Sequence, residues 1–77
     1  MNQETRILDY MLEYGSITAL EAMKEFGIMR LASRISDLKK RPDLKAKGYV
    51  FTKEMEKSTN RYGEKVAYAR YRLEVKP

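Results

Sequence analysis

Apolar residues recur at helical spacing through the first third of the chain. Residues 2–14 carry one such stripe, and Gly15 follows it where a helix needs a left-handed residue to end. Residues 18–26 carry a second, shorter stripe. Thr18 and Glu21 stand at its start with the T-x-x-E spacing of a capping box, in which each side chain bonds the other residue's backbone N–H. The pattern therefore predicts two helices separated by a short extended piece.

A third helical stripe follows a turn at Gly27 and predicts a helix from about Met29 to about Lys40. Pro42 ends this helix, because the residue before a proline is pushed out of the helical conformation. The stretch from Pro42 to Gly48 is predicted to be a connection. The apolar side of the helix consists of Leu31, Ile35 and Leu38. Its polar flank consists of Arg30, Arg34, Asp37 and Arg41, with Ser33 and Lys40 pointing away from the core.

The apolar period then changes to two, which is typical of strands with one buried face. Tyr49–Lys57 and Lys65–Val75 are the two predicted strands, and the polar stretch between them predicts a hairpin. Because a lone hairpin is unstable in water, its apolar face is expected to pack on the helices. Ser16 and Ile17 are extended and could pair with one of these strands. Residues on the expected inward face are Tyr49, Phe51, Met55, Ala67, Ala69, Tyr71, Leu73 and Val75, which leaves Arg70 and Arg72 facing solvent or a partner.

Size and composition exclude several classes of function. The 77 residues make one domain at most, spanning 1–77, and contain neither cysteine nor histidine. Disulfides, the usual zinc sites and the common nucleophile–base pairs are therefore ruled out, and we expect no enzyme, cofactor, catalytic residue, metal site or small-molecule substrate. No apolar run approaches the roughly 20 residues of a membrane span, and no signal-peptide pattern opens the chain. The expected location is the cytoplasm.

Charge is divided unevenly along the chain. Residues 1–27 carry two basic and five acidic residues, whereas residues 28–77 carry fourteen basic and six acidic ones. The net charges are thus −3 and +8, and the basic excess begins at the third predicted helix. Such an asymmetry favours a polyanionic partner.

Four short motifs add a family resemblance that covers about residues 16–73. They are the I-T-x-x-E-A cap from Ile17, the F-G-I turn at Phe26, the R-I-x-x-L helix from Arg34 and the N-R-Y-G stretch from Asn60. Together they resemble the small winged helix-turn-helix domains encoded by phages and mobile elements. The resemblance implies an α+β winged helix-turn-helix fold, with three helices and a C-terminal two- or three-stranded antiparallel β-hairpin as the wing.

The same resemblance implies a DNA-binding surface. The third helix, residues 29–41, would be the recognition helix in the major groove, and the wing at residues 58–66 would contact the backbone or minor groove beside it. An arginine on such a helix can bond guanine through two parallel hydrogen bonds. The candidate DNA-binding residues are Met29, Arg30, Ser33, Arg34, Lys40, Arg41, Asn60, Arg61, Tyr62 and Lys65.

Several of these residues also have structural alternatives. Asp37 could orient Arg34 or Arg41 rather than face DNA. The basic residues at the end of the third helix also suit the negative end of the helix dipole. Asn60 and Gly63 could simply form the turn of the hairpin.

The predicted function is binding of double-stranded DNA, as a phage or mobile-element regulator, excision factor or replication accessory protein. A homodimer or a host protein are further candidate partners, because one such domain alone is expected to bind weakly. The alternative function is a protein-binding module of the same fold. It would use the acidic first two helices to bind or inhibit a host protein, such as one that serves in defence.

Overall fold

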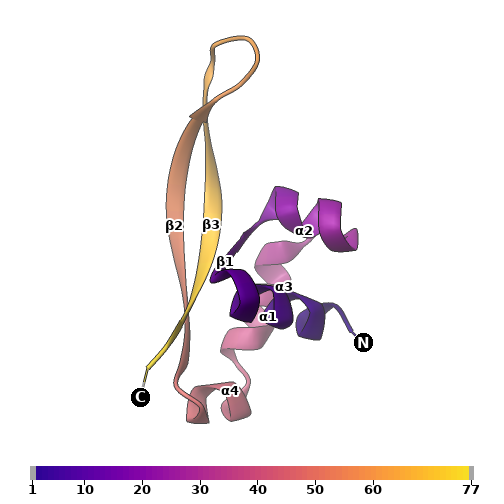
Figure 1. Cartoon of the computed structure of the whole chain (residues 1–77), viewed down its shortest axis with the longest axis vertical. Coiled ribbons are helices and arrows are strands. Elements are labelled where there is room, and N and C mark those ends of the chain that lie inside the picture. Colours follow the sequence, from indigo (N-terminus) through magenta and orange to yellow (C-terminus); the bar gives the residue numbers. More distant parts are fainter. Residues whose placement is uncertain (1, 77) are drawn as a thin grey trace.

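The computed structural model describes residues 2–76 and places four helices beside a three-stranded antiparallel sheet, an α+β arrangement (Figure 1). Residues 1 and 77, the ends of the predicted domain, lie outside this range. In chain order the elements are α1 (Gln3–Tyr14), β1 (Ser16–Thr18), α2 (Ala19–Phe26), α3 (Leu31–Lys39), α4 (Pro42–Ala46), β2 (Tyr49–Thr59) and β3 (Lys65–Val75).

Side-chain caps fix the ends of the first two helices. The Oδ1 atom of Asn2 accepts from the N–H of Thr5 at 2.8 Å, and Gly15 ends α1 with a φ of 84°. The predicted capping box of α2 is present in both directions, with Glu21 accepting from the N–H of Thr18 at 2.8 Å and Thr18 accepting from that of Glu21 at 3.2 Å. The first two predicted helices and their boundaries are therefore confirmed.

Strand β1 joins the helices to the hairpin. Its three residues pair antiparallel with β3, so that Ile17 lies opposite Tyr71, and β3 in turn pairs along its whole length with β2. The sheet order is thus β1-β3-β2, with β3 in the centre. The extended segment before α2 does pair with a strand, as the sequence predicted.

The core lies between the helices and the lower half of the sheet. Every helix contributes to it, and Ile17 and Phe51 contribute from the sheet. Burying each large side chain of this kind is worth roughly 1.5–3 kcal/mol, which is how a chain of this length gains its stability. The buried apolar residues are Ile7, Met11, Ile17, Ala22, Ile28, Leu31, Ile35, Leu38, Leu44 and Phe51.

The connection predicted after Pro42 is instead a fourth helix, so the prediction of three helices is wrong. Proline is favoured in the first turn of a helix, where its missing N–H costs nothing. Leu44 is buried and ties α4 to the core, and Gly48 ends the segment with a φ of 80°. A side chain at position 48 would also collide with the backbone carbonyl of Lys76, which closes the base of the hairpin.

The third helix is shorter than predicted. It spans Leu31–Lys39, whereas the sequence predicted a recognition helix over residues 29–41. Met29 and Arg30 belong to the turn between α2 and α3, and Arg41 is the residue that precedes α4. The apolar stripe of Leu31, Ile35 and Leu38 is buried as predicted.

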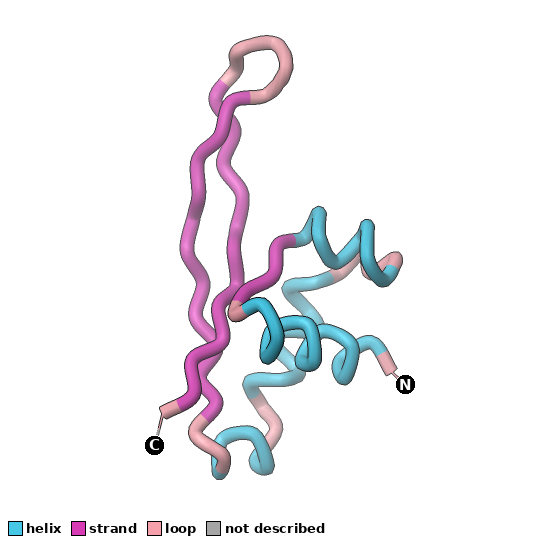
Figure 2. The backbone as a smooth tube through the Cα atoms, in the orientation of Figure 1, coloured by secondary structure: helices cyan, strands magenta, loops and turns pink. Residues whose placement is uncertain are grey.

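Only the lower half of the hairpin is covered by the helices, so the prediction of a buried face along both strands is wrong for the upper half. Each strand has 11 residues and spans about 36 Å, whereas the 12 residues of α1 span only about 18 Å. The hairpin therefore projects well beyond the helices, and the molecule measures 45 × 26 × 20 Å (Figure 2). Met55, predicted to face inward, is 61% exposed in this upper half, and Val75, also predicted to face inward, is 58% exposed at the base of the hairpin, opposite Tyr49. We refer to residues 53–71 as the wing.

Candidate nucleic-acid interface

The start of α3 is exposed and basic. Arg30 is the residue that caps this helix, yet its side chain makes no capping hydrogen bond, and the first turn of α3 holds no acidic residue. The N–H groups of that turn, which carry the positive end of the helix dipole, are thus open to an acceptor. Met29 and Ser33 are exposed on either side of Arg30 in sequence, and Met29 is 75% exposed.

Arg34 lies in a more restricted position one turn further along. Its Nη1 atom is 3.5 Å from Oδ2 of Asp37, which is the arrangement expected if Asp37 orients this arginine. Its Nε atom is buried and has no hydrogen-bond partner. The guanidinium group is therefore held against the protein on one side and paired with a carboxylate on the other.

Arg41 is bound to an acidic residue of α4. Its Nε and Nη2 atoms donate to the two carboxylate oxygens of Asp43 at 3.2 and 2.8 Å. This hydrogen bonding raises the pKa of Arg41 and lowers the pKa of Asp43 below its ordinary value. The proposed pairing of Arg41 with Asp37 is thus replaced by a pair with Asp43, while Lys40 remains exposed at the end of α3.

The loop at the wing tip is organised by Asn60. Its Oδ1 atom accepts from the N–H groups of Tyr62 and Glu64 at 2.9 and 3.0 Å, and its backbone carbonyl accepts from the N–H of Gly63 at 3.0 Å. Asn60 and Gly63 therefore form the turn of the hairpin, which is the structural alternative given for them above. The loop spans residues 60–64, because β2 continues to Thr59.

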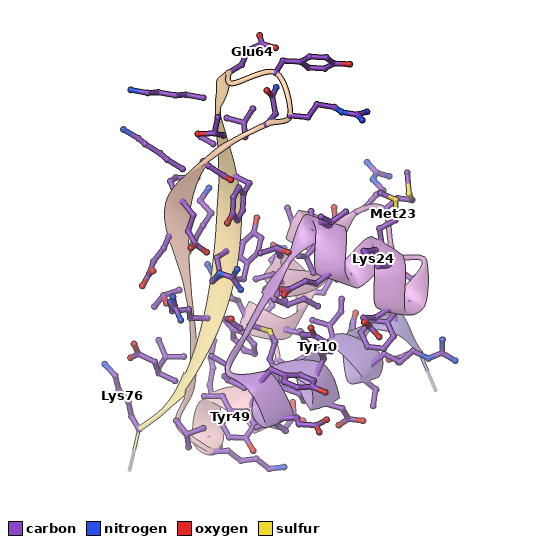
Figure 3. The ribbon with its side chains drawn as sticks, turned by 45° about the horizontal axis from the view of Figure 1, so that its top comes forward. Tyr10, Met23, Lys24, Tyr49, Glu64 and Lys76 are labelled. Atoms are coloured by element: carbon purple, nitrogen blue, oxygen red, sulfur yellow. The ribbon has the colours of Figure 1, made fainter. Side chains whose placement is uncertain are left out.

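Arg61 and Tyr62 form an exposed pair on this loop. The guanidinium carbon of Arg61 lies 5.9 Å from the centre of the Tyr62 ring, within the range of a cation–π contact. Lys65 follows as the first residue of β3 and is exposed as well. Figure 3 shows that this loop lies far from the base of the hairpin, with Glu64 at the tip and Tyr49 and Lys76 at the opposite end.

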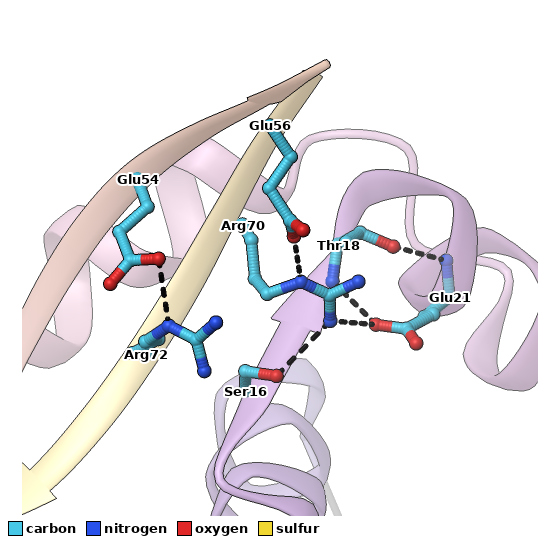
Figure 4. A network of polar contacts seen from close by, with 7 residues as sticks. All are labelled: Ser16, Thr18, Glu21, Glu54, Glu56, Arg70 and Arg72. Carbon is cyan, nitrogen blue, oxygen red and sulfur yellow. Dashed lines mark hydrogen bonds and ion pairs between the residues drawn. The ribbon is translucent and has the colours of Figure 1, made fainter. Parts of the chain in front are cut away.

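Arg70 and Arg72 lie on the predicted face of β3, and both form ion pairs there with glutamates of β2. The side chain of Arg70 extends from β3 toward the start of α2, where it donates to Glu56 and, at 3.1 Å, to the Oγ atom of Ser16 (Figure 4). Its Nη1 atom is also 3.6 Å from Glu21. The hydrogen bond with Glu56 raises the pKa of Arg70 above its ordinary value.

Arg72 makes a simpler and more exposed pair, with its Nε atom 3.0 Å from Glu54. Both pairs are diagonal across the β2–β3 register, in which Glu54 lies directly opposite Arg70. Both arginines lie on the face opposite the core residues, as predicted, and the register brings the acidic residues of β2 to that same face, where they form these ion pairs. The alternating glutamates of β2 and arginines of β3 are the sequence signal from which these ion pairs could have been predicted.

The arginines thus fall into two groups, those that form an ion pair with an acidic residue and those that do not. Among residues 2–76, four arginines have an ion pair, namely Arg34, Arg41, Arg70 and Arg72. Within the same range, Arg6, Arg30 and Arg61 have none. Two of those three lie where the sequence predicted DNA contacts, at the start of α3 and at the wing tip.

A cleft of different character lies between α1 and α2. It has a volume of about 320 Å³ and combines aromatic and acidic side chains. Tyr10 packs edge-on against Phe26 with ring centres 5.8 Å apart, and burial together with Glu21 and Glu25 raises the pKa of Tyr10. The lining residues are Arg6, Asp9, Tyr10, Glu13, Tyr14, Glu25 and Phe26. This cleft belongs to the acidic part of the chain.

Neither a membrane span nor a metal-binding cluster is found in the described part of the chain. No helix there is long and apolar enough to cross a bilayer. No group of three or more acidic, histidine or cysteine side chains is placed to hold a metal ion.

Comparison with known proteins agrees with this architecture. A family model described as a winged helix-turn-helix domain matches residues 2–76, nearly the whole chain. Comparisons with curated proteins and with solved structures gave no significant match. The match confirms the resemblance stated from the four sequence motifs, and an origin in phages or mobile elements stays a prediction.

Proposed function

Because the chain belongs to the winged helix-turn-helix family, we propose that it binds double-stranded DNA with α3 in the major groove and with residues 58–66 of the wing beside it. The observation that carries this proposal is the position of the arginines that have no ion pair. Arg30 and Arg61 have no acidic partner within residues 2–76, whereas most other arginines are neutralised by one. An arginine without an acidic partner can bind a phosphate without first breaking an ion pair, so its binding costs less free energy than that of a paired arginine.

The residues around the start of α3 have complementary roles in this proposal. Arg30 reaches the edge of a guanine, and Ser33 donates to a base or a phosphate. Met29 makes apolar contact with a thymine methyl group. Lys40 contacts a phosphate at the other end of the helix. Arg34 contributes its remaining N–H groups while Asp37 holds its orientation.

The wing tip supplies contacts to the backbone. Arg61 and Lys65 contact phosphates, and the exposed ring of Tyr62 packs against the sugar–phosphate chain. Asn60 acts through the loop, since its hydrogen bonds set the positions of Tyr62 and Glu64. Arg41 joins this surface only when a phosphate competes with Asp43 for its guanidinium group.

An amide chemical-shift titration with duplexes of mixed sequence tests the proposal. We expect the largest shifts in residues 29–41 and 58–66, with binding that weakens steeply as salt is raised. A gel-shift assay at low salt provides a simple check on binding itself. Absence of any complex at micromolar protein, or shifts confined to residues 1–26, would contradict DNA binding through α3 and the wing.

Substitution of Arg30 separates base recognition from folding. We expect Arg30→Ala to weaken duplex binding by about 1–3 kcal/mol, while the melting temperature stays nearly unchanged, because the Arg30 side chain makes no capping bond in α3. Fluorescence anisotropy and thermal unfolding measure the two quantities. Arg6→Ala is the matched control, since Arg6 is an exposed arginine on α1. A large loss of stability in Arg30→Ala would mark the residue as structural.

The proposed cellular role is that of a cytoplasmic phage or mobile-element protein that regulates transcription, assists excision or assists replication. One such domain buries roughly 600–1,000 Å² on DNA, so a homodimer or a host protein would raise its specificity. The second candidate function, a protein-binding module, is favoured by one observation. The acidic and aromatic cleft between α1 and α2 suits a basic segment of a partner. Under this alternative the titration would show no DNA-induced shifts in α3 or the wing.

A further inference from the structure

The two faces of the wing differ sharply in charge. In the β2–β3 register every odd-numbered residue pairs with an odd-numbered one, so the odd positions share one face and the even positions share the other. The odd face begins with the buried Phe51 and continues with the exposed Lys53, which lies opposite Tyr71 at the level of β1, and then with the exposed Met55 and Lys57 further toward the tip. Lys65 joins it from the start of β3.

Acidic residues are confined to the other face and the loop. Glu54 and Glu56 stand at even positions, where Arg72 and Arg70 pair with them. Among the described residues of β2 and β3, the odd face carries no carboxylate at all. We call the exposed part of it, Lys53, Lys57 and Lys65, the lysine face.

The lysine face is open to a large partner. All three lysines are exposed. Lys57 lies opposite Ala67, whose small side chain leaves Lys57 standing above the sheet, whereas Lys53 lies opposite Tyr71 and Lys65 opposite Thr59. Lys53 and Lys57 lie four residues apart, which is about 13 Å along a strand. That spacing is close to the roughly 12 Å width of the major groove, whose edges are lined by phosphates.

The lysine face points away from α2. A groove of about 450 Å³ separates the start of α2 from the wing, and the wing residues that line it include Ser58, Tyr68 and Arg70, all at even positions. The ion pair between Arg70 and Glu21 fixes that even face toward α2. The odd face is therefore on the opposite side of the wing, separate from the groove.

We propose that the lysine face is a second phosphate-binding surface, which contacts the backbone of duplex DNA beyond the segment bound by α3 and the wing tip. This inference rests on the proposed DNA-binding function, which already assigns Lys65 a phosphate contact, and extends it to Lys53 and Lys57. Charge complementarity carries it, because three ammonium groups without a carboxylate on their face match a row of phosphates. With this contact, the protein would cover a longer segment of DNA, extended at the end where the wing binds.

The test compares two double variants of equal charge. Lys53→Gln/Lys57→Gln removes two charges from the lysine face, and Lys45→Gln/Lys47→Gln removes two exposed charges from the region of α4, at the base of the hairpin. Fluorescence anisotropy with a 30-base-pair duplex, repeated over a series of salt concentrations, gives the dissociation constant and its salt dependence. We expect the wing variant to bind about tenfold more weakly and to lower the slope of log K against log salt by about 2. The α4 variant should keep the wild-type slope.

Each outcome decides a separate point. Equal weakening by both variants, or none by either, would overturn the lysine face while leaving the proposed function intact. Failure of the wild-type protein to bind any duplex would overturn both. Hydroxyl-radical footprinting supplies a second measurement, in which the wing variant should lose protection at one end of the site only. Circular dichroism checks the fold, and the single variant Lys57→Gln serves if the double variant is unstable.

Discussion

Replacing Leu38 with alanine is expected to lower the free energy of unfolding by about 3–5 kcal/mol. Leu38 is fully buried, with 0% exposure, and it belongs to the side of α3 that packs on the core. Alanine is the best helix former, so the loss measures the cavity and the missing contacts rather than a weaker helix. Because a domain of this size rarely has more than about 3–5 kcal/mol in total, much of the variant should be unfolded at 25 °C.

Urea unfolding followed by circular dichroism measures this loss, with Leu12→Ala as the matched control. Leu12 is also a helical leucine, but it is 47% exposed, so its replacement should cost less than about 1 kcal/mol. DNA binding by Leu38→Ala should fall in proportion to the folded fraction. Similar losses in the two variants would show that α3 does not pack on the core in the way described.

Replacing Arg70 with methionine is expected to cost about 2–3 kcal/mol. The change keeps an unbranched stem but removes the charge that lies among Glu56, Glu21 and the hydroxyl of Ser16. The Arg70 side chain is 22% exposed, so its loss leaves two partly buried carboxylates without their cation. Breaking a fully buried pair costs about 3–5 kcal/mol, and the partial exposure of this one reduces the expected loss.

The matched control is Arg72→Met, which breaks the exposed pair with Glu54 on the same strand and should cost less than about 1 kcal/mol. Equilibrium unfolding gives both values, and hydrogen exchange should show faster opening of the β1–β3 pairing in Arg70→Met. Adding Glu21→Gln and Glu56→Gln to Arg70→Met should restore part of the loss, since glutamine can still accept in the capping box of α2. If the two arginine variants lost equal stability, the role assigned to the Arg70 network would be wrong.

Local signals in the sequence were sufficient for most of the fold. The capping box at Thr18, the glycines that end α1 and α2, and the alternation in β2 and β3 each depend on neighbouring residues only. Helix α4 was missed because a five-residue helix carries too few apolar positions to show a period, and only Leu44 is buried. The uncovered part of the wing was missed because alternation indicates a strand without indicating how far its cover extends.

The candidate site depended more on contacts between distant parts of the chain. Residue type correctly indicated exposure for Arg30, Arg61 and Lys65, and the short-range pair between Arg34 and Asp37 was foreseen. The network around Arg70 joins β1, α2, β2 and β3, so it required the strand register. The same register was needed to separate the lysines of the wing from its glutamates.

The outer edge of β2 also affects how copies of the protein meet in concentrated solution. Within residues 2–76 this 11-residue strand pairs with β3 alone, which leaves the backbone groups of every second residue pointing to the other side, where a further strand could use them. If two copies met antiparallel about Met55, Lys53 would face the other copy's Lys57, and Glu54 would face its Glu56. Repulsion between these like charges opposes stacking of the hairpins into a continuous sheet, and so it protects an exposed strand from aggregation.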